Sequence, residues 1–241
     1  MRVLALDTTT RAGSVALVED GCVVAEEAGD ARRSHAERLP ADLLNLLRAR
    51  SLTPADVDLL AVAAGPGSFT GLRIGIATMQ GLAFVHRRQI VPVSLLETLG
   101  QVAGRDVPAG TIVAAWVDAH RHEVFSALYR VTGAAPYSPD RLVEIDAPAV
   151  GDPETILSRW HREALEAKSI HAFAGDGAVL YADRLGPDQR IVAPPALAST
   201  VGLMAGFRTR EALDPGAVQP LYLRRPDAEI EREQRKLSTT E

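Results

Sequence analysis

Short runs of hydrophobic residues alternate with turn-forming positions at the start of the chain. Val3–Asp7 and Ser14–Val18 form two such runs, and Cys22–Glu26 follows the dipeptide Asp20-Gly21, a strong signal for a hairpin turn. Runs of this length joined by turns this short are typical of antiparallel strands. The pattern therefore predicts that three antiparallel strands open the fold.

The next segment has the periodicity of an amphipathic helix that runs from Ser34 to about Arg50. Ser34 and Glu37 have the spacing of a capping box, in which each residue satisfies a free amide of the other. At 100° per residue the apolar side chains cover an arc of roughly 160°, which is wider than one contact with a sheet requires. We therefore expect this helix to contact two surfaces.

Alternating strands and helices follow. Asp58–Ala64 predicts a buried strand, which ends at a Gly-Pro-Gly turn before a helix at Ser68–Arg87. Ile90–Val93 predicts another strand, and Leu95–Val102 a short helix. Because apolar side chains occur all around the helix at 68–87, we expect it to be buried on nearly every side.

The stretch 104–110 has the composition of a linker. After it we expect two strands, a helix, a strand and a final helix, at Thr111–Val117, Glu123–Arg130, Pro153–Ala167, Ile170–Ala174 and Leu197–Leu213. Both parts thus open with antiparallel strands, which predicts a duplicated α/β fold. We place the first lobe at 1–104 and a reduced second lobe at 105–226, whose last helix is able to pack back on the first. The charged stretch 227–241 is predicted to be a frayed tail.

Composition limits the classes of function. With 241 residues, 46% hydrophobic and 24% charged, the chain can bury a sizeable core and is not disordered throughout. Lys and Arg number 26 and Asp and Glu 31, and the formal net charge of −5 argues against RNA or DNA binding by this chain alone.

The number of cysteines and the length of the hydrophobic segments indicate the cellular compartment of the protein. Cys22 is the single cysteine, which excludes an internal disulfide and a cysteine-based zinc cluster. Asp7 lies too early for the apolar core of a signal peptide, and no run of about 18 uncharged apolar residues could span a membrane. We expect a soluble cytoplasmic protein without membrane contacts.

The first candidate for chemistry is the turn that begins with Asp7-Thr8-Thr9-Thr10 at the end of the first strand. A carboxylate beside several hydroxyls in a tight turn can hold the phosphates of a Mg²⁺-bound nucleotide. The alternative is an ordinary turn, in which these side chains satisfy free backbone amides.

The second candidate is the glycine-rich loop that starts at Gly65 and opens the helix at 68–87. It lacks the lysine of a phosphate-binding P-loop, so Ser68 is better explained as a helix cap. Gly67, Gly71 and Gly75 recur every four residues and would let another helix approach closely. That helix belongs either to this chain or to a partner.

Metal and nucleophile signals are weak. His120-x-His122, near Asp118 and Glu123, is the only histidine cluster, and we interpret it as a surface pair on a strand rather than a metal site. No Gly-x-Ser-x-Gly nucleophile elbow is present. The stretch 175–177, Gly-Asp-Gly, indicates a turn in preference to a platform for a nucleotide base.

Several of these segments carry motifs of one family. They are L-A-L-D-T-T-T at Leu4–Thr10, S-H-A-E-R-L at Ser34–Leu39, G-P-G-S-F-T-G-L-R-I-G at Gly65–Gly75, V-D-A-H-R-H-E-V-F at Val117–Phe125 and P-L-Y-L-R at Pro220–Arg224. The stretch 65–75 is the most specific. Together they resemble the TsaB (YeaZ) family, a subunit of the bacterial machinery that makes threonylcarbamoyladenosine (t6A) in tRNA, over nearly the whole chain up to about Pro226.

The resemblance implies the two-lobed ASKHA fold, actin-like and related to ribonuclease H, with a mixed sheet in each lobe. Such chains are degenerate relatives of TsaD, the transferase, whose metal-binding His-x-x-x-His pair is absent here. Where the family commonly has Asp-Ala-Arg-Arg, this chain has Asp-Ala-His-Arg at 118–121, which leaves the role of His120 open.

The resemblance also implies a non-catalytic platform subunit without a metal or cofactor of its own. Its partners would be a TsaD homologue, as a heterodimer, and the TsaE ATPase, and the free chain would form a homodimer. ATP or ADP with Mg²⁺ is then expected only at the interface shared with the partner, and tRNA only through the complex.

Two sets of residues follow from this resemblance, and neither contains a catalytic residue. A residual nucleotide cleft is expected at Asp7, Thr8, Thr9, Ser14, Asp118, Gly175 and Gly177. The partner interface is expected on the helices at 34–50 and 68–87, at His35, Glu37, Leu39, Leu43, Leu46, Leu47, Thr70, Gly71, Arg73, Ile74, Gly75, Thr78 and Gln80.

A stand-alone ASKHA-type ATPase or kinase is the alternative from another class. It would use Asp7 for Mg²⁺, but it needs a second phosphate loop and a carboxylate in the second lobe. Asp118 is the candidate carboxylate, and the glycine run that normally follows such a residue is missing. ATP hydrolysis by the purified chain distinguishes the two hypotheses.

Overall fold

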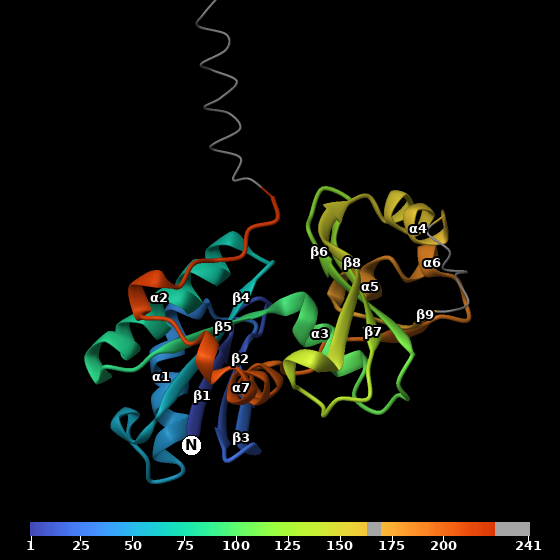
Figure 1. The fold of residues 1–241 in the computed structure, drawn as a ribbon. Coiled ribbons are helices and arrows are strands. Elements are labelled where there is room, and N and C mark those ends of the chain that lie inside the picture. Colours follow the sequence, from blue (N-terminus) through green and yellow to red (C-terminus); the bar gives the residue numbers. More distant parts are fainter. Residues whose placement is uncertain (163–169, 225–241) are drawn as a thin grey trace, which may run out of the picture.

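Two lobes lie side by side in the computed structural model, which describes residues 1–162 and 170–224 (Figure 1). Each lobe is built on a five-stranded sheet with helices on its faces. The predicted tail at 227–241 and the last part of the helix predicted at 153–167 lie outside the described residues.

The first sheet has the strand order β3-β2-β1-β4-β5. Strands β1, β2 and β3 are antiparallel, as predicted, and β4 and β5 run parallel to β1. Because helices cover both faces of the sheet, β1 and β4 are buried almost throughout and have continuous apolar sequences rather than alternating ones. The strands are β1 (Arg2–Asp7), β2 (Ser14–Glu19), β3 (Cys22–Ala28), β4 (Leu59–Gly65) and β5 (Ile90–Ser94).

Helices α1 (His35–Arg48) and α2 (Phe69–His86) cover one face of this sheet, and a 3₁₀ turn, η1 (Pro54–Asp56), leads into β4. The apolar arc of α1 packs on both the sheet and α2, which confirms the expected two contacts. Helix α2 is not buried on every side: Phe84 and Val85 at its outer end are 80% and 72% exposed. The apolar residues of α2 therefore exceed what the lobe itself covers.

The second sheet has the order β10-β9-β6-β7-β8, which in reverse repeats the connectivity of the first. Strands β6, β7 and β8 are antiparallel, and β9 and β10 run parallel to β6. The predicted duplication is therefore confirmed, although β8 and β10 were not predicted. The strands are β6 (Ile112–Asp118), β7 (Val124–Val131), β8 (Leu142–Gly151), β9 (Ile170–Ala174) and β10 (Arg190–Val192).

Helices of the second lobe pack on the two faces of this sheet. Helix α3 (Leu95–Ala103) lies on one face and also contacts β4 and β5 of the first sheet, so it joins the lobes. On the other face, α4 and α5 enclose a cluster around Trp116, Trp160 and Phe173. The remaining elements here are α4 (Pro153–Arg162), α5 (Asp176–Leu180), α6 (Ala182–Leu185) and η2 (Pro139–Arg141).

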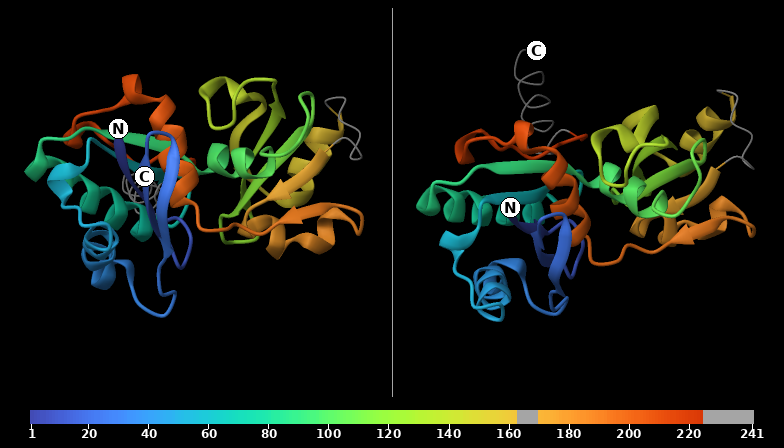
Figure 2. Two further views of the ribbon diagram at one scale, coloured as in Figure 1. Left: turned by 90° about the horizontal axis from the view of Figure 1, so that it is seen from below. Right: turned by 60° about the horizontal axis from the view of Figure 1, so that its bottom comes forward.

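Helix α7 (Ala198–Phe207) returns to the first lobe and covers the far face of its sheet (Figure 2). It is shorter than the predicted Leu197–Leu213, because the backbone leaves the helical conformation at Arg208. A 3₁₀ turn, η4 (Thr209–Glu211), follows, and Leu213 then pairs with Ile90 through two backbone hydrogen bonds.

Residues 214–224, which we call the C-terminal strap, begin with η5 (Pro215–Ala217) and run along α2 toward the second lobe. The side-chain amide of Gln80 donates to the carbonyls of Pro215 and Val218, and the Leu221 amide donates to Ala64 O at 2.7 Å. At its end the Arg224 guanidinium donates to Ala119 O in the second lobe, at 2.8 Å. No helix in the described ranges is long and apolar enough to cross a membrane.

Candidate functional site

The carboxylate of Asp7, at the end of β1, is fully buried. Its Oδ1 accepts hydrogen bonds from the Thr9 amide at 2.8 Å and the Thr9 hydroxyl at 2.5 Å, and its Oδ2 accepts from the Thr10 hydroxyl at 3.1 Å. Thr10 Oγ1 in turn accepts from the Gly13 amide. Both oxygens are therefore engaged in closing the β1–β2 turn.

Burial also changes the ionisation of this carboxyl. Desolvation raises the pKa of Asp7, and the hydrogen bonds from Thr9 and Thr10 only partly oppose it. A metal-binding aspartate needs an ionised oxygen that faces a ligand. The arrangement at Asp7 favours the ordinary-turn interpretation over a nucleotide-bound Mg²⁺.

The glycines of α2 face this turn. A Cβ atom at Gly75 would lie 2.2 Å from Thr8 Oγ1, and one at Gly71 would lie 2.5 Å from Thr8 O. Close approach therefore occurs between α2 and the β1–β2 turn of the same chain, and both glycines are buried. The prediction that Gly71 and Gly75 contact a partner is therefore wrong. The absence of side chains at these two glycines makes room for Thr8 of the same chain.

Ser14 has a structural role of a different kind. Its Oγ accepts hydrogen bonds from the amides of Leu197 and Ala198, at 3.1 and 3.0 Å, and so satisfies two free amides at the start of α7. The side chain is buried and is not part of the cleft between the lobes.

The turn between β9 and α5 brings Gly175 and Gly177 against β6. A Cβ at Gly175 would lie 1.9 Å from Trp116 O, and Gly175 has a φ of 125°. The Asp176 carboxylate accepts from the amides of Asp118 and Gly177, at 3.0 and 2.8 Å. Here the turn interpretation is supported, because backbone packing requires both glycines.

The histidine pair lies on the β6–β7 turn rather than on a strand, and His120 and His122 both have positive φ. His120 Nδ1 lies 3.2 Å from Asp118 Oδ2, and its amide donates to Asp118 Oδ1. In the two described ranges, no three side chains of metal-binding type come together.

Two cavities flank the tip of α2 between the lobes. One, of about 480 Å³, brings together Thr8, Thr9 and Asp118 of the predicted cleft, whereas Asp7, Ser14 and both Gly175 and Gly177 do not line it. Its rim carries three further groups that sequence reasoning did not select, namely Arg11, Arg32 and Arg33.

The other cavity, of about 540 Å³, lies beside the strap. There the rings of Phe69 and Tyr222 stack at 5.4 Å, and the Arg73 guanidinium lies 3.9 Å from the centre of the Phe69 ring while its Nε donates to the Tyr222 hydroxyl. Sequence spacing had suggested Arg73 and Gln80 as interface residues. In the structure both hold the strap.

The predicted interface on α1 needs a larger correction. Leu39, Leu43, Leu46 and Leu47 are at most 3% exposed and form part of the core between the sheet and α2. Periodicity identified the apolar face, but this face is covered by the chain itself. Among the other predicted members, Glu37, Thr70 and Arg73 are exposed, and His35, Ile74, Thr78 and Gln80 are half-buried.

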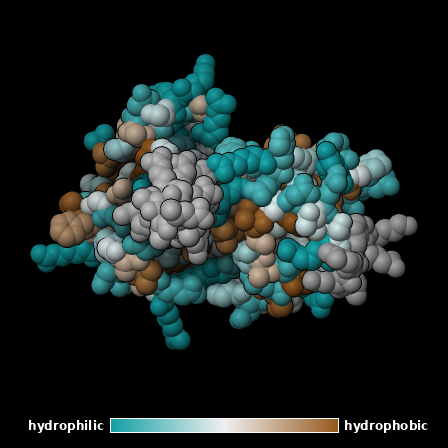
Figure 3. Space-filling view, turned by 90° about the horizontal axis from the view of Figure 1, so that it is seen from above, coloured by the Kyte–Doolittle hydropathy of each residue, from teal (hydrophilic) through white to brown (hydrophobic). Residues whose placement is uncertain are grey.

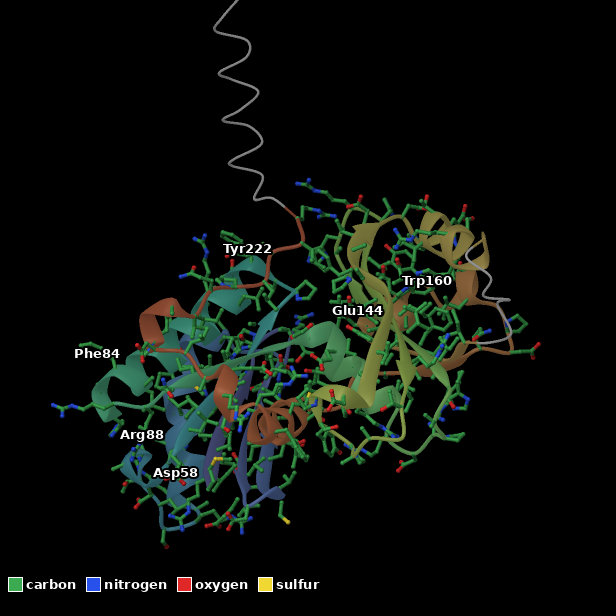
Figure 4. All side chains as sticks on the ribbon, viewed as in Figure 1. Asp58, Phe84, Arg88, Glu144, Trp160 and Tyr222 are labelled. Carbon is green, nitrogen blue, oxygen red and sulfur yellow. The ribbon has the colours of Figure 1, made fainter. Side chains whose placement is uncertain are left out.

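The outward side of the α1–α2 pair is instead lined by small and apolar side chains. Figure 4 shows Phe84 at the outer end of α2, directed away from the lobes. We call this side the outer helical face, and its exposed members are Ala36, Pro40, Ala41, Ala77, Gly81, Phe84 and Val85. None of them was in the predicted interface.

The repeated sheet order, the helices on both faces and the cavities between the lobes define a two-lobed actin-like protein of the ASKHA class. A solved activator of 2-hydroxyisocaproyl-CoA dehydratase from Clostridium difficile has this fold at a TM-score of 0.50 and 12% identity, covering 92% of this chain and all of that one.

The chain belongs to the TsaB/YeaZ family. The structure of YeaZ from Pseudomonas aeruginosa matches with a TM-score of 0.75 and 32% identity, over 92% of this chain and 99% of that one. The tRNA threonylcarbamoyladenosine biosynthesis protein TsaB of Escherichia coli is 42% identical over 130 residues, which span 54% of this chain and 55% of that protein. The profile of the TsaD family, described as tRNA N6-adenosine threonylcarbamoyltransferase, matches residues 19–154. Members of this family are involved in t6A biosynthesis.

Proposed function

We propose that this protein is a non-catalytic platform subunit, which binds a TsaD-type threonylcarbamoyltransferase and helps to recruit the TsaE ATPase. The proposal also holds that the free chain forms a homodimer, that nucleotide is held only at the interface shared with the transferase, and that tRNA is bound through the complex in the cytoplasm.

The observation that carries the proposal is the outer helical face. Exposed apolar residues that lie together on one side of a monomer are typical of interaction sites. Ala77 and Gly81 lie between Arg73 and Phe84 on α2, and their small side chains allow the backbone of a partner helix to approach closely. A two-helix surface of this kind suits a second two-helix surface, whether from the transferase or from a second copy of the chain.

The state of the first lobe supports a non-catalytic role. The Asp7 oxygens close their own turn, and the Ser14 hydroxyl caps α7. The two polar groups that a nucleotide-binding lobe would direct at phosphates are thus used for folding.

The experiment is co-elution of the purified chain with the TsaD homologue of the same organism in size-exclusion chromatography. Ala77→Arg combined with Gly81→Arg is expected to abolish the complex, because two bulky cations would lie at a close helix crossing. A Cβ at Gly81 has no neighbour within 4 Å and Ala77 is exposed, so we expect these substitutions to leave the lobe itself intact.

Gly133→Arg is the matched control. Gly133 lies on an exposed turn of the second lobe, and a Cβ there also meets nothing within 4 Å. The control is expected to co-elute like the wild type. Wild-type co-elution by the folded double variant would show that the transferase docks on another face.

A further inference from the structure

We propose that the cavity between α3, the C-terminal strap and strands β7 and β8 is a binding site for an organic cation, namely a primary ammonium group on a short aliphatic stem. The cavity measures about 390 Å³ and adjoins the cavity beside the strap, with which it shares Pro66, Leu221 and Leu223 in its lining. The proposal concerns a second site and does not depend on the platform function.

The polar floor of this cavity is formed by Tyr129, on β7. The residue is only 3% exposed, yet its ring lines the cavity, and its hydroxyl has no hydrogen-bond partner in the part of the chain that the structure describes. Its oxygen is not among the fully buried atoms that lack a partner, so it faces the open space of the cavity. The group is therefore positioned to accept a hydrogen bond from an occupant.

Glu144 lies directly opposite Tyr129 on the neighbouring strand β8. Residues opposite each other in an antiparallel pair point to the same face, with Cβ atoms about 5 Å apart. Among the described residues Glu144 has no ion-pair partner, and Figure 4 shows it on the edge of the second lobe where the lobes meet. Glu144 is exposed to solvent, and its carboxylate is an unpaired negative charge on the same sheet face as Tyr129.

A second carboxylate, Glu97 from α3, also lines the cavity, but both of its oxygens accept from the Arg208 guanidinium. The charge of Glu97 is thus balanced, and the net charge of the cavity lining is that of Glu144. Burial and the charges of Glu97 and Glu144 raise the pKa of Tyr129, so the phenol stays neutral while the site remains negative.

The rest of the wall is apolar. Leu142 and Pro148 come from the second lobe, and Leu221 and Leu223 from the strap. Figure 3 shows hydrophobic side chains at the surface where the two lobes meet. Mg²⁺ and Ca²⁺ need six or more oxygen ligands, which such a wall does not supply.

An ammonium group has three donors and no acceptor, and it can face Tyr129 Oη, Glu144 and the free lone pairs of Glu97. A stem of four to six methylene groups would lie against the four apolar side chains. The occupant would be either a free alkylamine or the side chain of a lysine. In both cases it would touch the strap and the second lobe together.

The test uses the full chain and titrates it with n-pentylammonium chloride, followed by saturation-transfer NMR and calorimetry at low salt. We expect saturable binding at least tenfold tighter than that of n-pentanol, which has the same size and no charge. Glu144→Gln is expected to weaken ammonium binding about tenfold, and Tyr129→Phe about threefold, with little effect on pentanol.

Glu27→Gln is the matched control, since it removes an exposed carboxylate from the edge strand β3, and it is expected to leave binding unchanged. Nα-acetyl-lysine methylamide distinguishes the two possible occupants. If it binds as tightly as pentylammonium, the site takes a lysine side chain; if it binds more weakly, the site takes a free alkylamine. Equal affinity for pentanol and pentylammonium, or equal binding by Glu144→Gln and Glu27→Gln, would overturn the proposal.

Discussion

Ser14 and Ala198 are 184 residues apart in the chain, and yet the Ser14 hydroxyl accepts the hydrogen bond of the Ala198 amide at 3.0 Å. The same oxygen accepts from Leu197, so a side chain at the start of β2 caps a helix near the end of the chain. This cap fixes the position of α7 on the far face of the first sheet.

Ser14→Ala should therefore destabilise the protein by about 2 kcal/mol, because two buried amides lose their acceptor. Urea unfolding measures the loss. The Ser68→Ala variant, which removes the exposed cap of α2, should lose less, since water can replace its single 3.3 Å bond. Equal losses in the two variants would contradict the buried-cap argument.

Gly75 and Gly81 lie on the same helix, but substitution by alanine is expected to change the stability of the protein in opposite directions at the two positions. Gly81→Ala should stabilise the protein by about 0.5–1 kcal/mol through helix propensity, because its new methyl group meets open space. Gly75→Ala should instead destabilise it by about 2 kcal/mol through the clash with Thr8 Oγ1.

The Gly75 effect can be traced to its cause in a double-mutant cycle. Thr8→Ala removes the clashing hydroxyl, so adding it to Gly75→Ala should recover about 1 kcal/mol relative to additivity. Strict additivity of the two unfolding free energies would show that the strain arises elsewhere.

Asp7 makes stability depend on pH in a defined direction. Its folded pKa is raised above the ordinary 3.8, so in the window above 3.8 the native state keeps a proton that the unfolded state has lost. Stability then falls as pH rises from about 3.8 through the folded pKa, and stays constant above it.

The variant Asp7→Asn lacks this pH-dependent contribution to stability, because its side chain does not titrate, but it keeps an acceptor oxygen for Thr9. We expect the stability of the wild type relative to Asp7→Asn to decrease as pH is raised from 4, as measured by urea unfolding at each pH. Parallel profiles of the two proteins would mean that Asp7 is ionised in the native state.

The strap should loosen when Tyr222 is truncated. Tyr222→Ala removes both the stack on Phe69 and the acceptor of Arg73, a loss of about 1 kcal/mol. Hydrogen exchange at the Leu221 amide, which is bonded to Ala64, should accelerate about fivefold. Tyr222→Phe keeps the stack and should show a smaller effect. Unchanged exchange at the Leu221 amide in both variants would show that the Phe69–Tyr222 stack does not hold the strap in place.

Local signals predicted much of the architecture. The Asp20-Gly21 turn and the caps at Ser34 and Ser68 each act within four residues, and the corresponding strands and helices formed as expected. Strand β8 was missed because it is half-exposed, contains Pro148 and lacks regular alternation, and three-residue β10 because it owes its stability to pairing with β9.

The candidate site was harder to predict, because its chemistry depends on which neighbours occupy each polar atom. The sequence indicated Asp7 and Ser14 as polar groups near a turn. It gave no sign that the following threonines occupy the carboxylate, or that a segment 183 residues away occupies the hydroxyl. Likewise, periodicity placed Leu39 and Leu46 on one face of α1 but could not identify what covers it.

The position of α7 also sets the order in which the lobes can fold during synthesis. The far face of the first sheet, with Val3, Val18 and Val93, is buried by Val201 and Met204 of α7. All five strands of the second sheet precede α7 in the chain, so they are translated before that helix leaves the ribosome. The nascent first lobe must carry an uncovered apolar face throughout this time. The lobe that is translated first is therefore the one that finishes folding last.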